Sequence, residues 1–99
     1  MTIDKKLNGN ELTLAIEGRL DTTTAPDLEK VVDESVTSDI TSLIIDFAKL
    51  EYISSAGLRV LLKSQKIMNK QGEMKVTNVS DVIGEIFEVT GFSDILTIA

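Results

Sequence analysis

The sequence predicts one α/β domain over residues 1–99, with a mixed, mostly parallel β-sheet and helices packed against it. A hairpin signal opens the chain, and strand-like and helix-like apolar patterns then alternate to the C-terminus. Glycines and serines stand where helices are expected to begin or end. The predicted element order is β-β-α-β-α-β-α-β, in which the alternation after the hairpin implies parallel strands joined by right-handed crossovers. A chain of this length can bury a single hydrophobic core.

The predicted hairpin occupies the N-terminus. The dipeptide Asn8-Gly9 favours a tight turn between two strands. Residues 2–7 before it form a weak strand pattern. After it, apolar and polar residues alternate over 11–17, which is typical of a strand with one buried face. Residues 18–24 are then expected to connect the hairpin to the first helix.

The first helix and a central strand follow. Thr24 is placed to cap the helix with its hydroxyl, and Pro26 suits the first turn. Apolar residues recur at helical spacing over 28–36. The apolar run over 43–45, which ends at Asp46, predicts a central strand buried on both faces. A loop is expected to lead from Asp46 to the next helix.

The second helix is expected to begin at Ser54-Ser55 and to run to about Gln71, where Gly72 supplies a left-handed cap. Apolar and polar residues alternate again over 73–77, and this alternation predicts the next strand.

The third helix is expected to begin after the capping residue Ser80 and to end at Gly91. A short last strand is predicted over 95–98. The side chains expected to point inward from the third helix are those of Val82, Ile83, Ile86 and Phe87.

Composition excludes several classes of function. The 10 Lys and Arg residues against 16 Asp and Glu give a formal net charge of −6, which disfavours binding to nucleic acid or to an anionic membrane. Without Cys or His, the chain lacks thiol nucleophiles, thiolate metal sites and the usual general base. No apolar run approaches the ~18 residues that cross a bilayer, and the N-terminus lacks a signal-peptide pattern. The composition therefore predicts a cytoplasmic protein that is not an enzyme and needs no cofactor or metal.

The segment 46–62 is the most informative for function, because it leads from a buried strand into a helix that opens with Ser54, Ser55 and Gly57. Free N–H groups and a partial positive charge make a helix N-terminus suitable for a phosphate. A phosphoserine there adds about −1.5 to −2 charges without melting the helix. Gly57 would allow the close approach of another backbone or a ligand. The alternatives are that the serines only cap the helix, and that Gly57 only packs against a neighbouring element.

A further set of segments is spread over nearly the whole chain: Gly18-Arg19-Leu20-Asp21, Leu43-Ile44-Ile45-Asp46-Phe47, Leu50, Tyr52-Ile53-Ser54-Ser55-Ala56-Gly57-Leu58, Gly72-Glu73-Met74 and Gly91-Phe92. In this combination of segments, the chain resembles a STAS domain of the anti-sigma-factor antagonist type.

This resemblance implies a partner-switching protein. In the family, the unmodified antagonist binds a GHKL-type serine kinase that doubles as an anti-sigma factor, and this binding frees the sigma factor. The kinase phosphorylates a serine at the start of the helix and the complex dissociates; a metal-dependent, PP2C-type serine phosphatase reverses the modification. By alignment the acceptor is Ser55. Ser54 is the alternate acceptor and stands where relatives usually carry an acid.

The resemblance also implies a partner-binding surface around the acceptor, formed by Asp21, Ser54, Gly57 and Arg59. Asp21 matches a family acid in the loop beside the phosphoserine helix, implicated in partner binding or phosphorylation; alternatively, it only caps its own loop. Arg59 is expected to be exposed, either as an interface contact or as part of a solvated face.

Three other functions are compatible with the sequence. Asp46, after a buried strand, could belong to a receiver domain or a metal-dependent phosphoryl-transfer enzyme, although the chain opens with a hairpin and lacks the receiver's early acidic pair. STAS modules in transport and sensing proteins suggest a nucleotide- or lipid-sensing module. A scaffold protomer is the third possibility. In the sensing and scaffold cases the serines would not be phosphorylated.

Overall fold

The computed structural model describes residues 1–99 and contains a four-stranded sheet with the order β1-β2-β3-β4. The strands are β1 (Thr2–Asn8), β2 (Glu11–Leu20), β3 (Ser42–Ile53) and β4 (Glu73–Thr77). Strands β1 and β2 are antiparallel, and the other neighbouring pairs are parallel. Gly9 closes the hairpin with a φ of 62°, a conformation that suits glycine. The predicted mixed sheet with an N-terminal hairpin is therefore confirmed.

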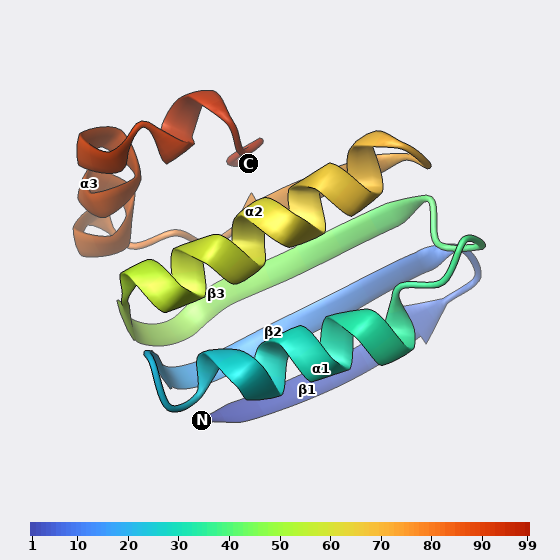
Figure 1. Ribbon diagram of the computed structural model, residues 1–99, viewed down its shortest axis with the longest axis horizontal. Helices are drawn as coiled ribbons and strands as arrows, with labels where there is room; N and C mark the ends of the chain where they lie inside the picture. The colour runs from blue at the N-terminus through green and yellow to red at the C-terminus, as the bar shows by residue number, and fades with distance from the viewer.

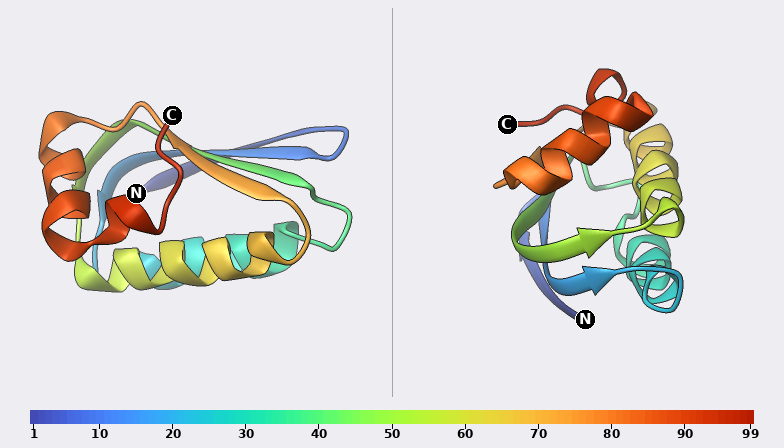
Figure 2. Two further views of the ribbon diagram at one scale, coloured as in Figure 1. Left: turned by 90° about the horizontal axis from the view of Figure 1, so that it is seen from above. Right: turned by 90° about the vertical axis from the view of Figure 1, so that its left-hand side faces the viewer.

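Two helices cover one face of this sheet. The chain forms three α-helices, α1 (Ala25–Ser35), α2 (Ser55–Asn69) and α3 (Asp81–Thr90), and a 3₁₀-helix, η1 (Phe92–Asp94), follows them. The two that cover the face are α1 and α2. In Figure 1, α1 and α2 lie side by side across the sheet, while α3 lies at one end of it. Figure 2 shows that the opposite face of the sheet carries no helix. The hydrophobic core therefore lies between the sheet and the α1–α2 layer.

The central strand is longer than predicted, and only one of its faces is fully buried. Strand β3 continues to Ile53, so the segment expected to be a loop after Asp46 is strand. Leu43 and Ile45 are buried, but Ile44 is only partly buried, on the face that carries no helix. The prediction of two buried faces was wrong because both crossover helices lie on the same side of the sheet, which an apolar run does not reveal.

Strand β2 also extends beyond its predicted end, to Leu20, so the predicted connection over 18–24 is correct only from residue 21. Its pairing with β3 shifts register twice, once between Ala15 and Glu17 and once next to Gly18, whose φ is 101°. Such bulges bend strands. Figure 2 shows both strands curling toward the helix layer at this end, where Leu20 is buried beneath the start of α2.

Gly72 follows α2 without the predicted left-handed conformation, since its φ is not positive. Its backbone instead lies against the start of β3. A Cβ atom at this position would collide with the carbonyl oxygen of Thr41, which accepts a hydrogen bond from Glu73 N at 3.0 Å. The glycine is therefore explained by close packing of two backbones.

Helix α3 has the predicted ends, because Ser80 Oγ accepts a hydrogen bond from Ile83 N at 3.3 Å and Gly91 has a φ of 82°. Ile83 and Phe87 are buried, as predicted. Val82 is 65% exposed, so its predicted inward orientation was wrong. A helix at the end of a sheet buries a narrower face than a helix that lies across the sheet. Val82 lies outside the buried face of α3 for this reason.

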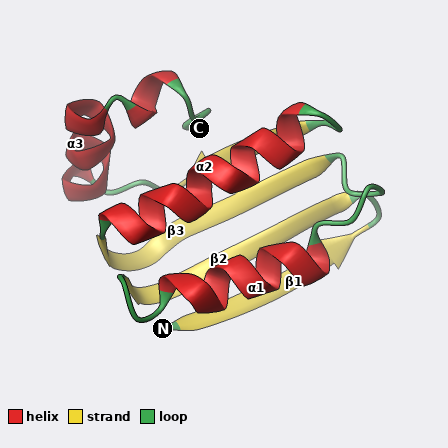
Figure 3. Ribbon diagram, in the orientation of Figure 1, coloured by secondary structure: helices red, strands yellow, loops and turns green.

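The predicted last strand is replaced by η1 and a single bridge. Figure 3 shows the segment after η1 as loop. Only Ile98 pairs with β4, through Val76. The residues that follow Gly91 form η1, so too few residues remain to form a ladder of hydrogen bonds with β4. None of the helices has both the length and the apolar character needed to span a bilayer.

Candidate phosphorylation and partner-binding site

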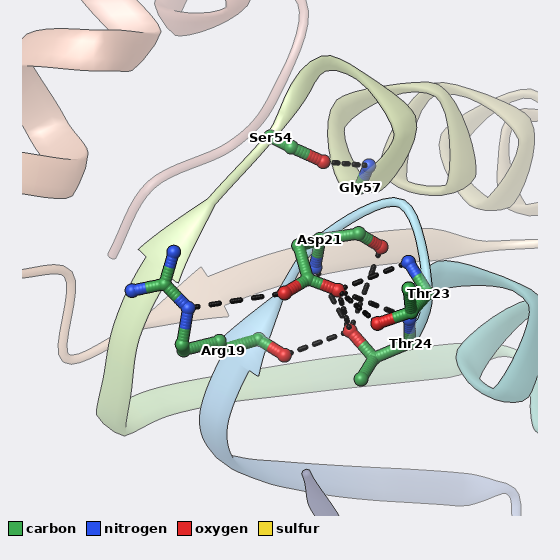
Figure 4. Close-up of polar contacts among 6 residues, drawn as sticks. All are labelled: Arg19, Asp21, Thr23, Thr24, Ser54 and Gly57. Atoms are coloured by element: carbon green, nitrogen blue, oxygen red, sulfur yellow. Dashed lines mark hydrogen bonds and ion pairs between the residues drawn. The ribbon is translucent and has the colours of Figure 1, made fainter.

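The predicted site residues lie at the edge of the sheet where β2 and β3 end and α1 and α2 begin. Figure 4 shows three of them there, Asp21, Ser54 and Gly57. Ser54 N donates a hydrogen bond to Leu20 O at 2.9 Å, which joins the start of α2 to the end of β2. A shallow depression of about 230 Å³ lies between the two helix starts and includes Pro26, Ala56 and Arg59 in its lining. The loop after β2 and the first turns of α2 therefore form one continuous surface.

The two adjacent serines have different roles. Ser54 is the N-cap of α2, with extended backbone angles, and its Oγ accepts a hydrogen bond from Gly57 N at 3.4 Å. Ser55 is the first residue of the helix and is exposed, and its hydroxyl forms no hydrogen bond within the protein. The Ser54 hydroxyl is thus engaged in capping, whereas the Ser55 hydroxyl is exposed and has no partner within the protein.

The first turn of α2 carries no acidic side chain. Helices α1 and α3 each carry an acid in the first turn, Asp27 and Asp81, but α2 carries none. The partial positive charge at a helix N-terminus favours an anion there. A phosphate on Ser55 would supply that anion.

Gly57 is buried and is required for packing. A Cβ atom at this position would lie 2.8 Å from Leu20 Cγ and 2.9 Å from Ile53 Cγ1. Both distances are shorter than ordinary van der Waals contact, so a larger residue would force Leu20 and Ile53 to shift where the first turn of α2 lies on the ends of β2 and β3. Gly57 therefore contributes to the site by positioning the two serines.

Asp21 organises the loop that leads into α1. Its Oδ1 accepts hydrogen bonds from Thr23 Oγ1 at 2.8 Å, Thr23 N at 3.0 Å and Thr24 N at 3.2 Å. The Thr23 hydroxyl is the main cause that lowers the pKa of Asp21 below its ordinary value. The predicted side-chain cap by Thr24 was wrong: its Oγ1 accepts a hydrogen bond from Asp21 N at 2.8 Å and lies 2.8 Å from Arg19 O, which places its hydroxyl outside the helix.

Comparison with known proteins identifies the family. The sequence profile of the STAS domain matches residues 2–99. The chain belongs to the STAS domain family. The anti-sigma-B factor antagonist of Bacillus subtilis (strain 168) is 33% identical over 101 residues, an alignment that covers 100% of this chain and 91% of the relative.

Solved structures share the fold of this STAS domain. An anti-sigma factor antagonist from Mycobacterium paratuberculosis superimposes with a TM-score of 0.88 at 22% identity, over 98% of this chain and 83% of that one. The Bacillus cell fate determinant SpoIIAA, in its phosphorylated form, gives a TM-score of 0.77 at 16% identity, over 99% of this chain and 91% of that one. Both likenesses bear out the predicted α/β architecture.

The STAS domain also contains an aromatic–cation pair at this edge that sequence reasoning did not assign to the site. Arg19 Cζ lies 4.4 Å from the centroid of the Tyr52 ring, and Arg19 Nε lies 3.8 Å from Asp21 Oδ2. Arg19 and Tyr52 are register partners on β2 and β3. Both belong to the segments that resemble the family, but the bulges between the strands conceal their pairing in the sequence.

Arg59 is exposed, as predicted, and lies one turn after Ser55 on α2. Asp21, Ser54, Ser55 and Arg59 thus share one edge of the molecule, with Gly57 packed beneath them. The arrangement offers a free hydroxyl at a positive helix end, flanked by charged side chains of both signs.

Proposed function

We propose that this STAS domain is an anti-sigma factor antagonist that works by partner switching. In its unmodified form it binds a GHKL-type serine kinase that also acts as an anti-sigma factor. Phosphorylation of Ser55 ends this binding, and a PP2C-type serine phosphatase restores it. The domain itself acts as a binding protein and catalyses no reaction.

One observation supports Ser55 as the phosphate acceptor. This serine has an exposed hydroxyl without a hydrogen-bond partner within the protein, at a helix N-terminus that has no acid in its first turn. The hydroxyl of the alternate acceptor, Ser54, is engaged with Gly57 N. The one-third identity to an anti-sigma-B factor antagonist supports the partner class.

The acceptor protein contributes only a serine hydroxyl to the phosphoryl transfer. Ser55 Oγ attacks the γ-phosphorus of ATP in the kinase, the bond from that phosphorus to the ADP oxygen breaks, and the hydroxyl proton passes to a base of the kinase. The product carries a dianion in the contact surface. A buried, unpaired interfacial charge costs ~2–5 kcal/mol or more, and each 1.4 kcal/mol is about tenfold in affinity. One phosphate can therefore weaken binding by tens to thousands of times without unfolding either protein.

The test is a phosphotransfer assay. The purified protein, Ser54→Ala and Ser55→Ala are each mixed with ATP and the host's GHKL-type serine kinases, and the products are mapped by mass spectrometry. We expect one phosphate on Ser55 in the parent chain and in Ser54→Ala, and none in Ser55→Ala.

Other outcomes would overturn specific parts of the proposal. A phosphate on Ser54 would keep the mechanism and move the acceptor. Stable kinase binding without a phosphate would indicate a constitutive antagonist. Neither phosphate nor binding with any kinase would reject partner switching and favour the ligand-sensing or scaffold function.

A further inference from the structure

We infer that Arg59 is the intramolecular partner of the phosphate on Ser55. Phosphorylation would then have two effects on the partner-binding surface: it adds an anion, and it withdraws a cation that is free in the unmodified protein. The inference rests on the proposed function, because it requires a phosphate at Ser55.

The positions on α2 allow the pair to form. Residues four apart on a helix lie one above the other on the same face, and long side chains lean toward the helix N-terminus. From position 59, an arginine side chain can therefore reach the turn that contains Ser55. An acid that precedes a base by four residues is also the favoured orientation of a helical ion pair.

No other group on α2 competes for Arg59. The positions three and four residues away on either side are Ser55, Ala56, Leu62 and Lys63, none of which is acidic. The whole helix contains no Asp or Glu. Arg59 is exposed and takes part in none of the ion pairs of the structure.

The neighbouring charges are already engaged. Arg19, the other arginine at this edge, lies over the Tyr52 ring. Lys63 lies 3.3 Å from Glu29 Oε2 and 3.0 Å from Asp33 Oδ1, both on α1. Glu29 shares the depression with Arg59, but its carboxylate is directed to that lysine. Arg59 is thus the cation available to a new anion at the start of α2.

A guanidinium suits this anion. Its planar N–H groups can donate two parallel hydrogen bonds to a phosphate, and such charge-assisted bonds are about twice as strong as neutral ones. The phosphate would also be close to the free N–H groups of the first turn of α2. Before phosphorylation, the same guanidinium remains available to a carboxylate of the bound partner.

The test needs no kinase. Phosphoserine is incorporated at position 55 during translation, and its second pKa, ordinarily about 6, is measured by ³¹P NMR titration at physiological ionic strength, where charges separated by more than about 8 Å are largely screened. The parent, Arg59→Gln and Lys66→Gln are compared, each with this phosphoserine. Lys66 is a matched control: it is exposed, has no ion pair and lies on the same helix, roughly 16 Å beyond Ser55 at 1.5 Å per residue.

A cation beside the phosphate favours the dianion and lowers this pKa. We expect the pKa in Arg59→Gln to be higher than in the parent by about 0.3 unit, and the value in Lys66→Gln to match the parent. Equal values in the parent and Arg59→Gln, or equal shifts in both variants, would overturn the inference. Because the phosphate is installed without a kinase, this result is independent of the phosphotransfer assay that tests the proposed function.

Discussion

At the residue scale, the adjacent serines at the start of α2 differ in what their hydroxyl groups do. Ser54 caps the helix through Gly57 N, whereas Ser55 forms no hydrogen bond within the protein. We predict that Ser54→Ala lowers the free energy of unfolding by about 1 kcal/mol, the usual cost of losing an N-cap. Ser55→Ala should change it by less than about 0.5 kcal/mol. Urea denaturation measures both; an equal loss in the two variants would contradict the assignment of the cap.

The Asp21 loop gives a prediction about pH. The Thr23 hydroxyl is the main cause that lowers the pKa of Asp21 from its ordinary 3.8. A lowered folded-state pKa means that the unfolded state binds the proton more readily, so the stabilisation is complete above pH 3.8 and is lost as the pH falls through the folded-state pKa. NMR titration should show a higher Asp21 pKa in Thr23→Ala. Thr22→Ala, an exposed neighbour without a hydrogen bond to Asp21, should leave it unchanged.

The residue scale also shows how much of the site the sequence could predict. The caps at Ser54 and Ser80 and the loop-capping role of Asp21 follow from local chemistry, and the structure confirms them. The predicted Thr24 cap was wrong because the Thr24 hydroxyl bonds Asp21 N and Arg19 O in the preceding loop, and no side chain caps α1. The Arg19 contact with the Tyr52 ring could not be predicted, because it depends on a register that passes two bulges.

At the element scale, the glycine after α2 is explained by backbone packing. We predict that Gly72→Ala lowers the free energy of unfolding by about 1–3 kcal/mol, because its Cβ would overlap the Thr41 carbonyl, which cannot rotate away. Gly84→Ala in α3 is the control. Its Cβ would lie 3.6 Å from Val79 Cγ1, an ordinary contact, and alanine favours a helix interior by roughly 0.5–1 kcal/mol over glycine. The midpoint temperature of thermal unfolding should therefore fall in Gly72→Ala and rise in Gly84→Ala.

The elements that were predicted incorrectly depended on long-range information. Local periodicity located β4 and the three helices well, and it gave the start of β2 but not its end. It could not show that β3 would continue past Asp46, because the later part of β3 follows the bent end of β2 as its partner. The prediction of a final strand was wrong for a related reason. Its pairing required the chain to return to β4 after η1, and only Ile98 pairs with β4.

At the scale of the whole molecule, folding and partner binding are predicted to respond oppositely to charge at position 55. Ser55→Asp places a carboxylate at the N-terminus of α2, where the helix dipole favours it by about 0.3–1 kcal/mol. No core residue changes, since Ser55 is exposed. We therefore expect Ser55→Asp to unfold at the same or a higher temperature than the parent and to bind the kinase at least about tenfold more weakly, as ~1.4 kcal/mol of unpaired interfacial charge would give.

A matched variant separates this local effect from the total charge of an already acidic chain. Ser38 is exposed and belongs to the connection between α1 and β3. Figure 1 shows this connection at the opposite end of the molecule from the start of α2. Ser38→Asp adds the same single negative charge to a net charge of −6, but separations beyond about 8 Å are largely screened at physiological ionic strength. Calorimetric titration of both variants with the kinase should show weaker binding for Ser55→Asp alone. Equal weakening in both would mean that the kinase responds to overall charge, and the contact surface would then not be centred on Ser55.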